Sequence, residues 1–151
     1  MYLIEKIKDS EYRAIFELMK ANMYFMQSEI GLEWKQSEIE SNYRNKINFS
    51  IYRKGDLAAF VSLAINELDV FIHTLQVKDK YQNGMVGYTV FRHISELAKE
   101  HQVSTLKCCV FENNPARHMY ENLSFRETSR DNKVLKIELD VDSVHLRGIS
   151  T

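Results

Sequence analysis

The chain has 151 residues, a formal net charge of -1 and a hydrophobic share of 44%, values that suit one globular domain with a single core. The charge balance argues against binding to nucleic acid or to an anionic membrane, and the apolar runs are too short to span a bilayer. The first ten residues, MYLIEKIKDS, alternate charged and apolar side chains. They do not resemble a signal peptide, so we expect a cytoplasmic protein.

The first elements in chain order are a strand and two helices. The pattern predicts a strand over Tyr2–Ile7, and then a helix that begins at an N-terminal cap on Ser10 and ends near Gln27. Ser37 is a candidate cap for a second helix. The first helix carries an apolar stripe that we expect to face the core, and its members are Ile15, Leu18, Met19, Met23 and Met26.

Strands and one long helix follow. Two β-rich runs between residues 47 and 65 flank Lys54, Gly55 and Asp56, which together predict a hairpin turn. A further strand is expected over Leu68–Val77, with apolar residues on both faces, as in the covered middle of a sheet. A helix to about His101 comes next, with an apolar stripe at Val86, Val90, Ile94 and Leu97.

The last third of the chain is predicted as a strand over Thr105–Glu112, a short helix with Pro115 in its first turn, and a hairpin that turns near Asp131 and Asn132. This order of elements predicts an α/β fold with a mixed sheet rather than a strictly alternating parallel one. We expect one domain over residues 1–140 and a polar tail over 141–151.

Cys108 and Cys109 are adjacent in a predicted strand. Neighbouring strand residues point to opposite faces, so these two thiols are poorly placed to form a disulfide or to chelate a metal together. We interpret both as reduced, small apolar residues of a buried strand. The five histidines are scattered, and we predict no metal site.

The stretch YQNGMVGY, residues 81–88, is the first candidate site. Gly84 and Gly87 lie between a predicted strand and a predicted helix. Such a turn can bind a phosphate through free backbone N–H groups at the helix N-terminus, where the helix dipole is also positive. On its own, however, this pattern is weak and more often marks a simple turn.

The second candidate site is FENNPARHMYENLSF, residues 111–125. Asn113 follows a strand and Tyr120 lies on the next helix, so both are expected near the carboxyl edge of the sheet, where ligands of α/β proteins usually bind. The alternative makes Asn113 a helix cap and Tyr120 a packing residue.

Together these two stretches resemble the GNAT superfamily of N-acetyltransferases over most of the chain. The first family motif reads Q/R-x-x-G-x-G/A, and here Gln82 opens it and Gly87 closes it, while Met85 replaces the middle glycine. The second motif reads N-x-x-A-x-x-x-Y-E-x-x-G-F. Its matches are Asn113, Ala116, Tyr120, Glu121 and Phe125, with Ser124 where glycine is usual.

The resemblance implies a mixed, mostly antiparallel sheet of about seven strands with a splayed central parallel pair and about four flanking helices. It implies acetyl-CoA as cosubstrate, with backbone amides of the first motif on the pyrophosphate and the strand around residues 75–77 on the pantetheine arm. The implied cofactor residues are Leu75, Val77, Gln82, Asn83, Gly84, Met85, Val86, Gly87, Tyr88 and Asn113.

The same resemblance makes Tyr120 the general acid. A phenol with a pKa of about 10 stays protonated at neutral pH and can protonate a departing thiolate, whose parent pKa is about 8.5. His73 is a candidate general base because its pKa is suited to the task. A water chain or the absence of a dedicated base are the alternatives.

The expected acceptor is a small-molecule or peptide amine. In the family, the early helices help to build the acceptor pocket, and here Tyr24, Glu33 and Trp34 offer aromatic and acidic groups to a cationic amine. A solvated acidic helix surface explains the same residues equally well. We expect a monomer or a homodimer.

Two other functions are compatible with parts of the sequence. A non-catalytic acyl-CoA-binding or regulatory module would account for Met85 and Ser124, which depart from the family motifs. A Rossmann-type nucleotide-binding domain is disfavoured by the hairpins and by the missing acidic residue on a following second strand.

Overall fold

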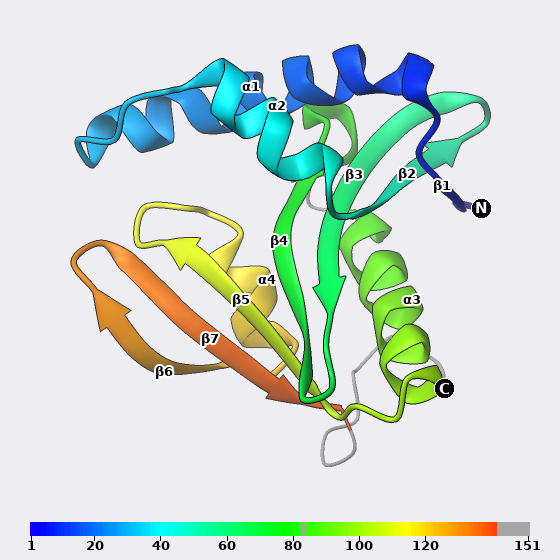
Figure 1. Cartoon of the computed structure of the whole chain (residues 1–151), viewed down its shortest axis with the longest axis vertical. Helices are drawn as coiled ribbons and strands as arrows, with labels where there is room; N and C mark the ends of the chain where they lie inside the picture. The colour runs from blue at the N-terminus through cyan, green and yellow to red at the C-terminus, as the bar shows by residue number, and fades with distance from the viewer. Residues whose placement is uncertain (83, 142–151) are drawn as a thin grey trace. The chain divides into compact units, whose positions relative to one another are not determined.

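The structure is a computed structural model that describes residues 1–82 and 84–141. Seven strands and four α-helices are formed by these residues (Figure 1). The strands are β1 (Leu3–Lys6), β2 (Ile47–Arg53), β3 (Asp56–Ile65), β4 (Asp69–Val77), β5 (Thr105–Phe111), β6 (Arg126–Asp131) and β7 (Val134–Asp140). The helices are α1 (Tyr12–Glu29), α2 (Gln36–Arg44), α3 (Val86–Glu100) and α4 (Arg117–Asn122).

The strands form one mixed sheet in the order β1-β2-β3-β4-β5-β7-β6. The pairs β1–β2, β2–β3, β5–β7 and β6–β7 are antiparallel. β4 and β5 are parallel, in a register that runs from Asp69↔Thr105 to Ile72↔Cys108. The predicted mixed, mostly antiparallel sheet with a central parallel pair is therefore confirmed, whereas the splaying of that pair remains a prediction.

The chain groups into two compact units. The first unit comprises Met1–Leu63 and Thr74–Val86, and the second comprises Ala64–His73 and Gly87–Thr151. Of the predicted tail, the structure describes Val141, which is buried and whose backbone N–H donates to the Ser104 carbonyl at 2.8 Å. Residues 142–151 lie outside the described part of the chain.

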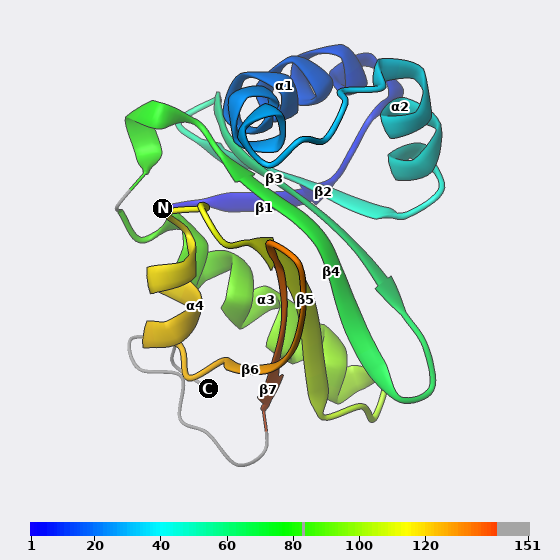
Figure 2. The same cartoon turned by 90° about the vertical axis from the view of Figure 1, so that its left-hand side faces the viewer.

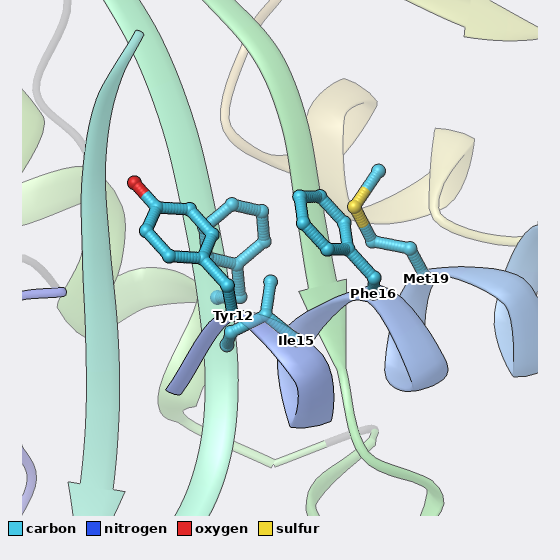
Figure 3. Close-up of a cluster of buried hydrophobic side chains, with 5 residues drawn as sticks. Tyr12, Ile15, Phe16 and Met19 are labelled. Atoms are coloured by element: carbon cyan, nitrogen blue, oxygen red, sulfur yellow. The ribbon is translucent and has the colours of Figure 1, made fainter. Parts of the chain in front are cut away.

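In the first unit, α1 and α2 cover the β1–β3 strands (Figure 2). Four α1 side chains, Tyr12, Ile15, Phe16 and Met19, gather on one face of the helix (Figure 3) and form a buried cluster with Phe60 of β3. Because these positions recur at helical spacing, the predicted apolar stripe is confirmed over its first half. Its later members, Met23 and Met26, are only half-buried.

Both predicted hairpin turns are present, and positive backbone φ angles explain their residues. Arg53 pairs with Asp56 across Lys54 (φ 51°) and Gly55 (φ 79°), which are the left-handed conformations that a two-residue hairpin loop requires. In the second hairpin Asp131 pairs with Val134, and Asn132 takes a φ of 54°.

The predicted helix caps in the first unit are wrong. Ser10 lies inside a 3-10 turn over Asp9–Glu11, and α1 begins after it at Tyr12. The turn is held instead by the Glu11 carboxylate, which accepts the Lys8 backbone N–H at 2.7 Å. Ser37 lies within α2, which begins at Gln36. Neither α1 nor α2 has a side-chain cap hydrogen bond.

The second unit contains the helices α3 and α4 together with the strands β5, β7 and β6 (Figure 1). Val86, Val90 and Ile94 of α3 are fully buried, as predicted, whereas Leu97, the last member of the predicted stripe, is half-buried. Cys108 is buried but Cys109 is exposed, so the interpretation of both as buried residues is wrong for Cys109. The short helix begins at Arg117 rather than including Pro115, and the residues before it form hydrogen-bonded turns.

Candidate active site

The connection from β4 to α3 begins with a strand end whose backbone is tied to Gln82. The Gln82 side-chain amide donates to the Val77 carbonyl at 2.9 Å and to Asp79 Oδ1 at 3.2 Å. Between these residues the chain makes a 3-10 turn over Asp79–Tyr81. The side chain of Gln82, the residue that opens the first motif, therefore holds the loop in shape. Asn83, which follows it, lies outside the described residues.

Asp56 anchors this loop to the start of β3. It accepts the Tyr81 hydroxyl at 2.7 Å and lies 3.6 Å from the ammonium groups of both Lys78 and Lys80. The Tyr81 hydrogen bond, helped by the two lysine charges, lowers the pKa of the Asp56 carboxyl below its ordinary value. The same hydrogen bond raises the pKa of Tyr81. The loop thus carries two lysines beside the first motif.

The glycine that closes the motif packs against the side chain of Met119. Gly87 is buried in the first turn of α3, and a Cβ at this position would collide with the Met119 sulfur of α4. Gly87 is not among the residues with a positive φ. The absence of a side chain here lets α3 and α4 approach closely.

Met85, which replaces the middle glycine, is accommodated without backbone strain. The non-glycine residues with positive φ in the described chain are Lys54, Gln102, Ser124 and Asn132, and Met85 is not one of them. Its side chain is 55% exposed. The methionine therefore retains a backbone N–H at this position and directs its side chain partly into solvent.

The second motif begins in the turn after β5. Asn113 is exposed in this turn. Its neighbour Asn114 accepts the Ala116 backbone N–H on Oδ1 at 2.9 Å, and Ala116 is itself the N-cap of α4, without a side-chain cap bond. Arg117 donates to the Glu112 carbonyl at 2.9 Å and closes the same turn. The alternative that made Asn113 the helix cap is therefore wrong.

Tyr120 is buried in an aromatic cluster, with 4% of its surface exposed. Its ring meets Phe91 of α3 edge-on at a centroid distance of 5.6 Å and Phe125 at 5.3 Å. Three aromatic rings packed edge to face hold one another in a fixed orientation. The position of the phenol is therefore set by α3, α4 and the residue that follows α4.

Ser124 explains why the family motif has glycine at this point. The Ser124 N–H donates to the Glu121 carbonyl at 2.9 Å and the Phe125 N–H to the Tyr120 carbonyl at 3.0 Å. This pair of bonds is the Schellman ending of a helix, which places its first residue after the cap in the left-handed region. Ser124 takes that conformation, with a φ of 74°. Ser124 therefore replaces the usual glycine of the motif without changing the backbone geometry of the helix end.

The Tyr120 hydroxyl is hydrogen-bonded to the Cys108 thiol of β5. Burial, followed by the proximity of Cys108 and this hydrogen bond, raises the pKa of Tyr120 well above its ordinary 10.0. Burial also raises the pKa of Cys108 to about 12, against the opposing effect of the Tyr120 bond. Both groups therefore stay protonated at neutral pH, with the phenol as the donor and the sulfur as the acceptor.

The candidate base lies on β4. The His73 ring packs on Phe71 at a centroid distance of 4.7 Å and is half-buried. Asp69 lies on the same face of β4 as Phe71 and His73. Its carboxylate is 3.3 Å from the Lys107 ammonium and accepts the Asn66 side-chain amide at 2.9 Å. The role of His73 as a general base remains a prediction.

The predicted acceptor residues are only partly brought together. Tyr24 and Trp34 meet at a centroid distance of 6.4 Å, and the Lys20 ammonium lies 5.8 Å from the Tyr24 ring. The Trp34 indole donates to Gln36 at 2.7 Å, and Glu33 is exposed. A separate groove of about 550 Å³ runs along α1 and α2 and has both acidic and basic walls.

None of the helices described is long and apolar enough to cross a membrane. No group of three or more His, Cys, Asp or Glu side chains that could hold a metal ion occurs within residues 1–82 and 84–141.

The pattern of both motifs agrees with a family model. The model of the acetyltransferase (GNAT) family matches residues 11–125, which include α1, α3, α4 and both candidate stretches. The chain belongs to the GNAT acetyltransferase family. The resemblance seen in the sequence is confirmed, and members of this family are acyltransferases.

Solved structures share this GNAT fold at low sequence identity. The PaiA N-acetyltransferase of Thermoplasma acidophilum, solved in complex with coenzyme A, has a TM-score of 0.74 and 13% identity, covering 93% of this chain and 99% of its own. The ribosomal-protein-S18-alanine N-acetyltransferase of Escherichia coli has a TM-score of 0.72 and 19% identity, covering 100% of both chains. Ard1 of Thermoplasma volcanium has a TM-score of 0.72 and 14% identity, covering 93% and 97%. No curated protein matches the chain.

Two groups near the motifs were not anticipated from the sequence. Asn22 of α1 donates to the Val77 carbonyl at 3.1 Å, and Cys108 binds the candidate acid. A polar residue in the apolar stripe of α1 was the available signal for Asn22. The sequence carries no corresponding signal that pairs Cys108 with Tyr120.

Proposed function

We propose that this GNAT protein is an acetyl-CoA-dependent N-acetyltransferase that transfers the acetyl group directly to a primary amine within a ternary complex. The observation that carries the proposal is Tyr120, a buried phenol held at the family's tyrosine position by a Schellman helix end. A group that stays protonated through neutral pH is suited to donate a proton to a leaving thiolate.

The cofactor assignment follows the first motif. We assign the pyrophosphate of coenzyme A to backbone N–H groups at residues 82–88, at the start of the 15-residue helix α3. Unpaired N–H groups and the helix dipole favour a phosphate at such a position. The lysines of the preceding loop, Lys78 and Lys80, add positive charge. The complex of the PaiA enzyme with coenzyme A supports this choice of cosubstrate.

The pantetheine arm is assigned to the backbone at Leu75 and Val77, with Asn113 orienting it. The Val77 carbonyl already accepts two side-chain amides, from Asn22 at 3.1 Å and from Gln82 at 2.9 Å. Because a carbonyl oxygen has two lone pairs, this one is fully used. The hydrogen bonds to the arm and to the thioester carbonyl must come from other backbone groups of the strand.

The reaction forms one bond and breaks one. The neutral amine attacks the thioester carbonyl, and backbone N–H donors stabilise the negative charge that develops on its oxygen. As the intermediate collapses, the C–S bond breaks and Tyr120 protonates the departing sulfur. The amine's extra proton passes to His73 or to water, and solvent restores the Tyr120 proton.

Tyr120 can change hydrogen-bond partner at low cost. In the resting protein its hydroxyl donates to the neutral thiol of Cys108, and sulfur in a thiol is a weak acceptor. A bond from the phenol to a developing thiolate is charge-assisted and roughly twice as strong as a neutral one. The exchange from one sulfur to the other therefore favours proton delivery.

The acceptor is proposed to be a primary amine on a small molecule or a peptide. The E. coli neighbour acetylates an alanine of ribosomal protein S18, which makes a peptide α-amine one reasonable choice. Tyr24, whose ring already lies 5.8 Å from the Lys20 ammonium, is suited to bind a cationic amine together with Trp34 and Glu33. We expect the chain to act in the cytoplasm as a monomer or a homodimer.

Thermal-shift titration with acetyl-CoA, coenzyme A and NAD tests cofactor binding first, since a ligand of the folded state must raise the melting temperature. A rise with both CoA species and none with NAD is expected. Failure of both CoA species to raise it would reject the proposal and also the alternative, a non-catalytic acyl-CoA-binding module.

Thiol release from acetyl-CoA over a panel of amines then separates an enzyme from a binding module. Tyr120→Phe should lower kcat about 100-fold or more, as loss of a general acid does, while the affinity for coenzyme A changes less than about threefold. Tyr2→Phe is the matched control, because its hydroxyl accepts a long bond from Arg53 at 3.4 Å while its edge-on ring contact with Tyr81 is kept by phenylalanine. Loss of affinity in Tyr120→Phe would assign the phenol to binding instead.

A further inference from the structure

Asn22 is a polar residue on the core-facing side of α1. It lies three positions after Met19 and seven after Ile15, so it continues the stripe that those two buried side chains begin. A half-buried amide in an apolar stripe costs free energy unless its donors and acceptor find partners. The partners it has found are all on β4.

Both donors of the Asn22 amide are used at the C-terminal end of β4. Nδ2 donates to Gln76 Oε1 at 3.0 Å and to the Val77 carbonyl at 3.1 Å. Since a backbone carbonyl only accepts, the atom facing Val77 must be the nitrogen, which fixes the orientation of the amide. The Gln76 amide in turn donates to Thr74 Oγ1 at 2.6 Å.

This chain of bonds lies in the interior. Gln76 is 4% exposed and Thr74 is 8% exposed, so water cannot easily replace a lost partner there. Unpaired buried amides cost about 1–3 kcal/mol each. The polar side chains of β4 thus depend on Asn22 for their arrangement, although Asn22 is 54 and 55 positions away in sequence from the two groups it binds.

The Val77 carbonyl joins Asn22 to the loop that opens the first motif. It accepts Asn22 from α1 and Gln82 from the loop at 3.1 and 2.9 Å. With both lone pairs occupied, the carbonyl is held from two directions. The helix that carries Tyr24 and the loop that begins at Gln82 are therefore both bonded to one backbone atom at the end of β4.

We propose that Asn22 is a positioning residue of this acetyltransferase, which fixes the end of β4 through Val77 and Gln76 so that the strand meets the coenzyme arm in a reactive geometry. The inference rests on the proposed function, because it assigns the β4 backbone to the cofactor. A displacement of about 1 Å at a reacting group can cost about 100-fold in rate. Loss of the Asn22 bonds should therefore act on kcat more than on the amine's KM.

Asn22→Leu removes both donors while keeping a similar volume. We expect kcat with acetyl-CoA to fall about tenfold, with the KM for the amine changed less than about twofold. Asn45→Leu is the matched control, since the side chain of Asn45, the C-cap residue of α2, donates to the Ser41 carbonyl at an exposed site. It should leave kcat and both KM values unchanged.

The double variant Asn22→Leu, Gln76→Leu separates positioning from general stability. Replacing both partners of a buried hydrogen bond by apolar groups restores much of the lost stability. Positioning predicts that the melting temperature recovers while kcat stays low, because Val77 still lacks its Asn22 donor. Recovery of kcat together with the melting temperature would overturn the proposal.

Hydrogen–deuterium exchange supplies a measurement that needs no activity. Asn22→Leu should speed amide exchange in peptides covering residues 76–82 at least about fivefold, and should leave the β2–β3 hairpin unchanged. Unchanged exchange over residues 76–82 would overturn the role of Asn22 even in an active enzyme. If the wild-type chain fails to bind coenzyme A, the proposed function fails, and the exchange result still decides whether Asn22 holds the end of β4.

Discussion

Tyr120 and Phe125 close helix α4 together. The Phe125 N–H donates to the Tyr120 carbonyl at 3.0 Å, and the two rings meet edge-on at 5.3 Å. The hydrogen bond and the apolar contact are the two parts of a Schellman ending. The same residues that end the helix therefore also orient the phenol, which gives the spacing of tyrosine and phenylalanine in the motif a physical reason.

Ser124→Gly should stabilise the protein. Ser124 holds a φ of 74°, where a Cβ costs about 1–2 kcal/mol and glycine costs none, although glycine loses about 0.5–1 kcal/mol of chain entropy. We expect a net gain of about 0.5–1 kcal/mol, or a rise of roughly 1–4 °C in melting temperature for a chain of this size. Differential scanning calorimetry measures it.

Gln102→Gly is the matched control for this prediction. Gln102 ends α3 in the same way, with a φ of 58° and an N–H that donates to the Lys99 carbonyl at 3.1 Å. A gain of similar size is expected there. If Ser124→Gly lowers the melting temperature while Gln102→Gly raises it, the serine makes a stabilising contribution of its own and the interpretation is wrong.

The close approach of Gly87 to Met119 predicts that a large side chain at position 87 is destabilising. A Cβ there would collide with the Met119 sulfur, and overpacking a buried site costs about 1–3 kcal/mol. Gly87→Val should lower the free energy of unfolding by that amount in urea denaturation. Met119→Ala should restore at least half of the loss when combined with Gly87→Val. Simple additivity of the two changes would show that they do not share this contact.

Local patterns predicted most of the fold. The hairpin at Lys54 and Gly55 and the stripe of α1 were predicted because turn residues and helical spacing act over a few positions. The predicted serine caps were wrong because a residue's intrinsic preference for a helix start is easily overridden by its surroundings. Ser10 and Ser37 are good caps in isolation, but at the first of these helix starts the Lys8 N–H bonds to Glu11 instead. Cys109 was misassigned because strand alternation does not say whether the second face is covered.

The candidate site was predictable only where a motif spans it. Tyr120 was named from its spacing to Asn113 and Phe125, all within one short stretch. The partners that set its chemistry, Cys108 on β5 and Phe91 on α3, come from other elements. Which side chains meet across elements depends on how helices and strands pack, and a single sequence does not specify this.

The buried thiol predicts that the protein loses stability in alkaline solution. The pKa of Cys108 is raised by burial from 9.0 to about 12. Above pH 9 the unfolded chain releases a proton that the folded chain keeps, so the unfolded state binds fewer protons and the free energy of unfolding falls as pH rises. The full stabilisation is present below pH 9. Between pH 9 and about pH 12 the free energy of unfolding falls by up to about 1.4 kcal/mol per pH unit.

Urea denaturation between pH 8 and pH 11 measures this loss. Cys108→Ala should give a shallower decline of the free energy of unfolding than the wild type, even though it is less stable at pH 8. Cys109→Ala is the comparison, since this exposed thiol should account for less of the slope. Parallel declines in the wild type and Cys108→Ala would contradict the buried, protonated thiol.

The two adjacent cysteines should differ sharply in reactivity. Cys109 is exposed, whereas Cys108 is 3% exposed, has a pKa of about 12 and donates to the Cys109 carbonyl at 3.6 Å. Because only the accessible thiolate reacts, a colorimetric disulfide reagent at pH 8 should titrate about one thiol per folded chain and a second only after unfolding. Cys109→Ser should abolish the fast phase and Cys108→Ser should preserve it. Two fast thiols in the folded wild type would show that β5 opens readily around Tyr120, and would remove the basis for a fixed, buried acid.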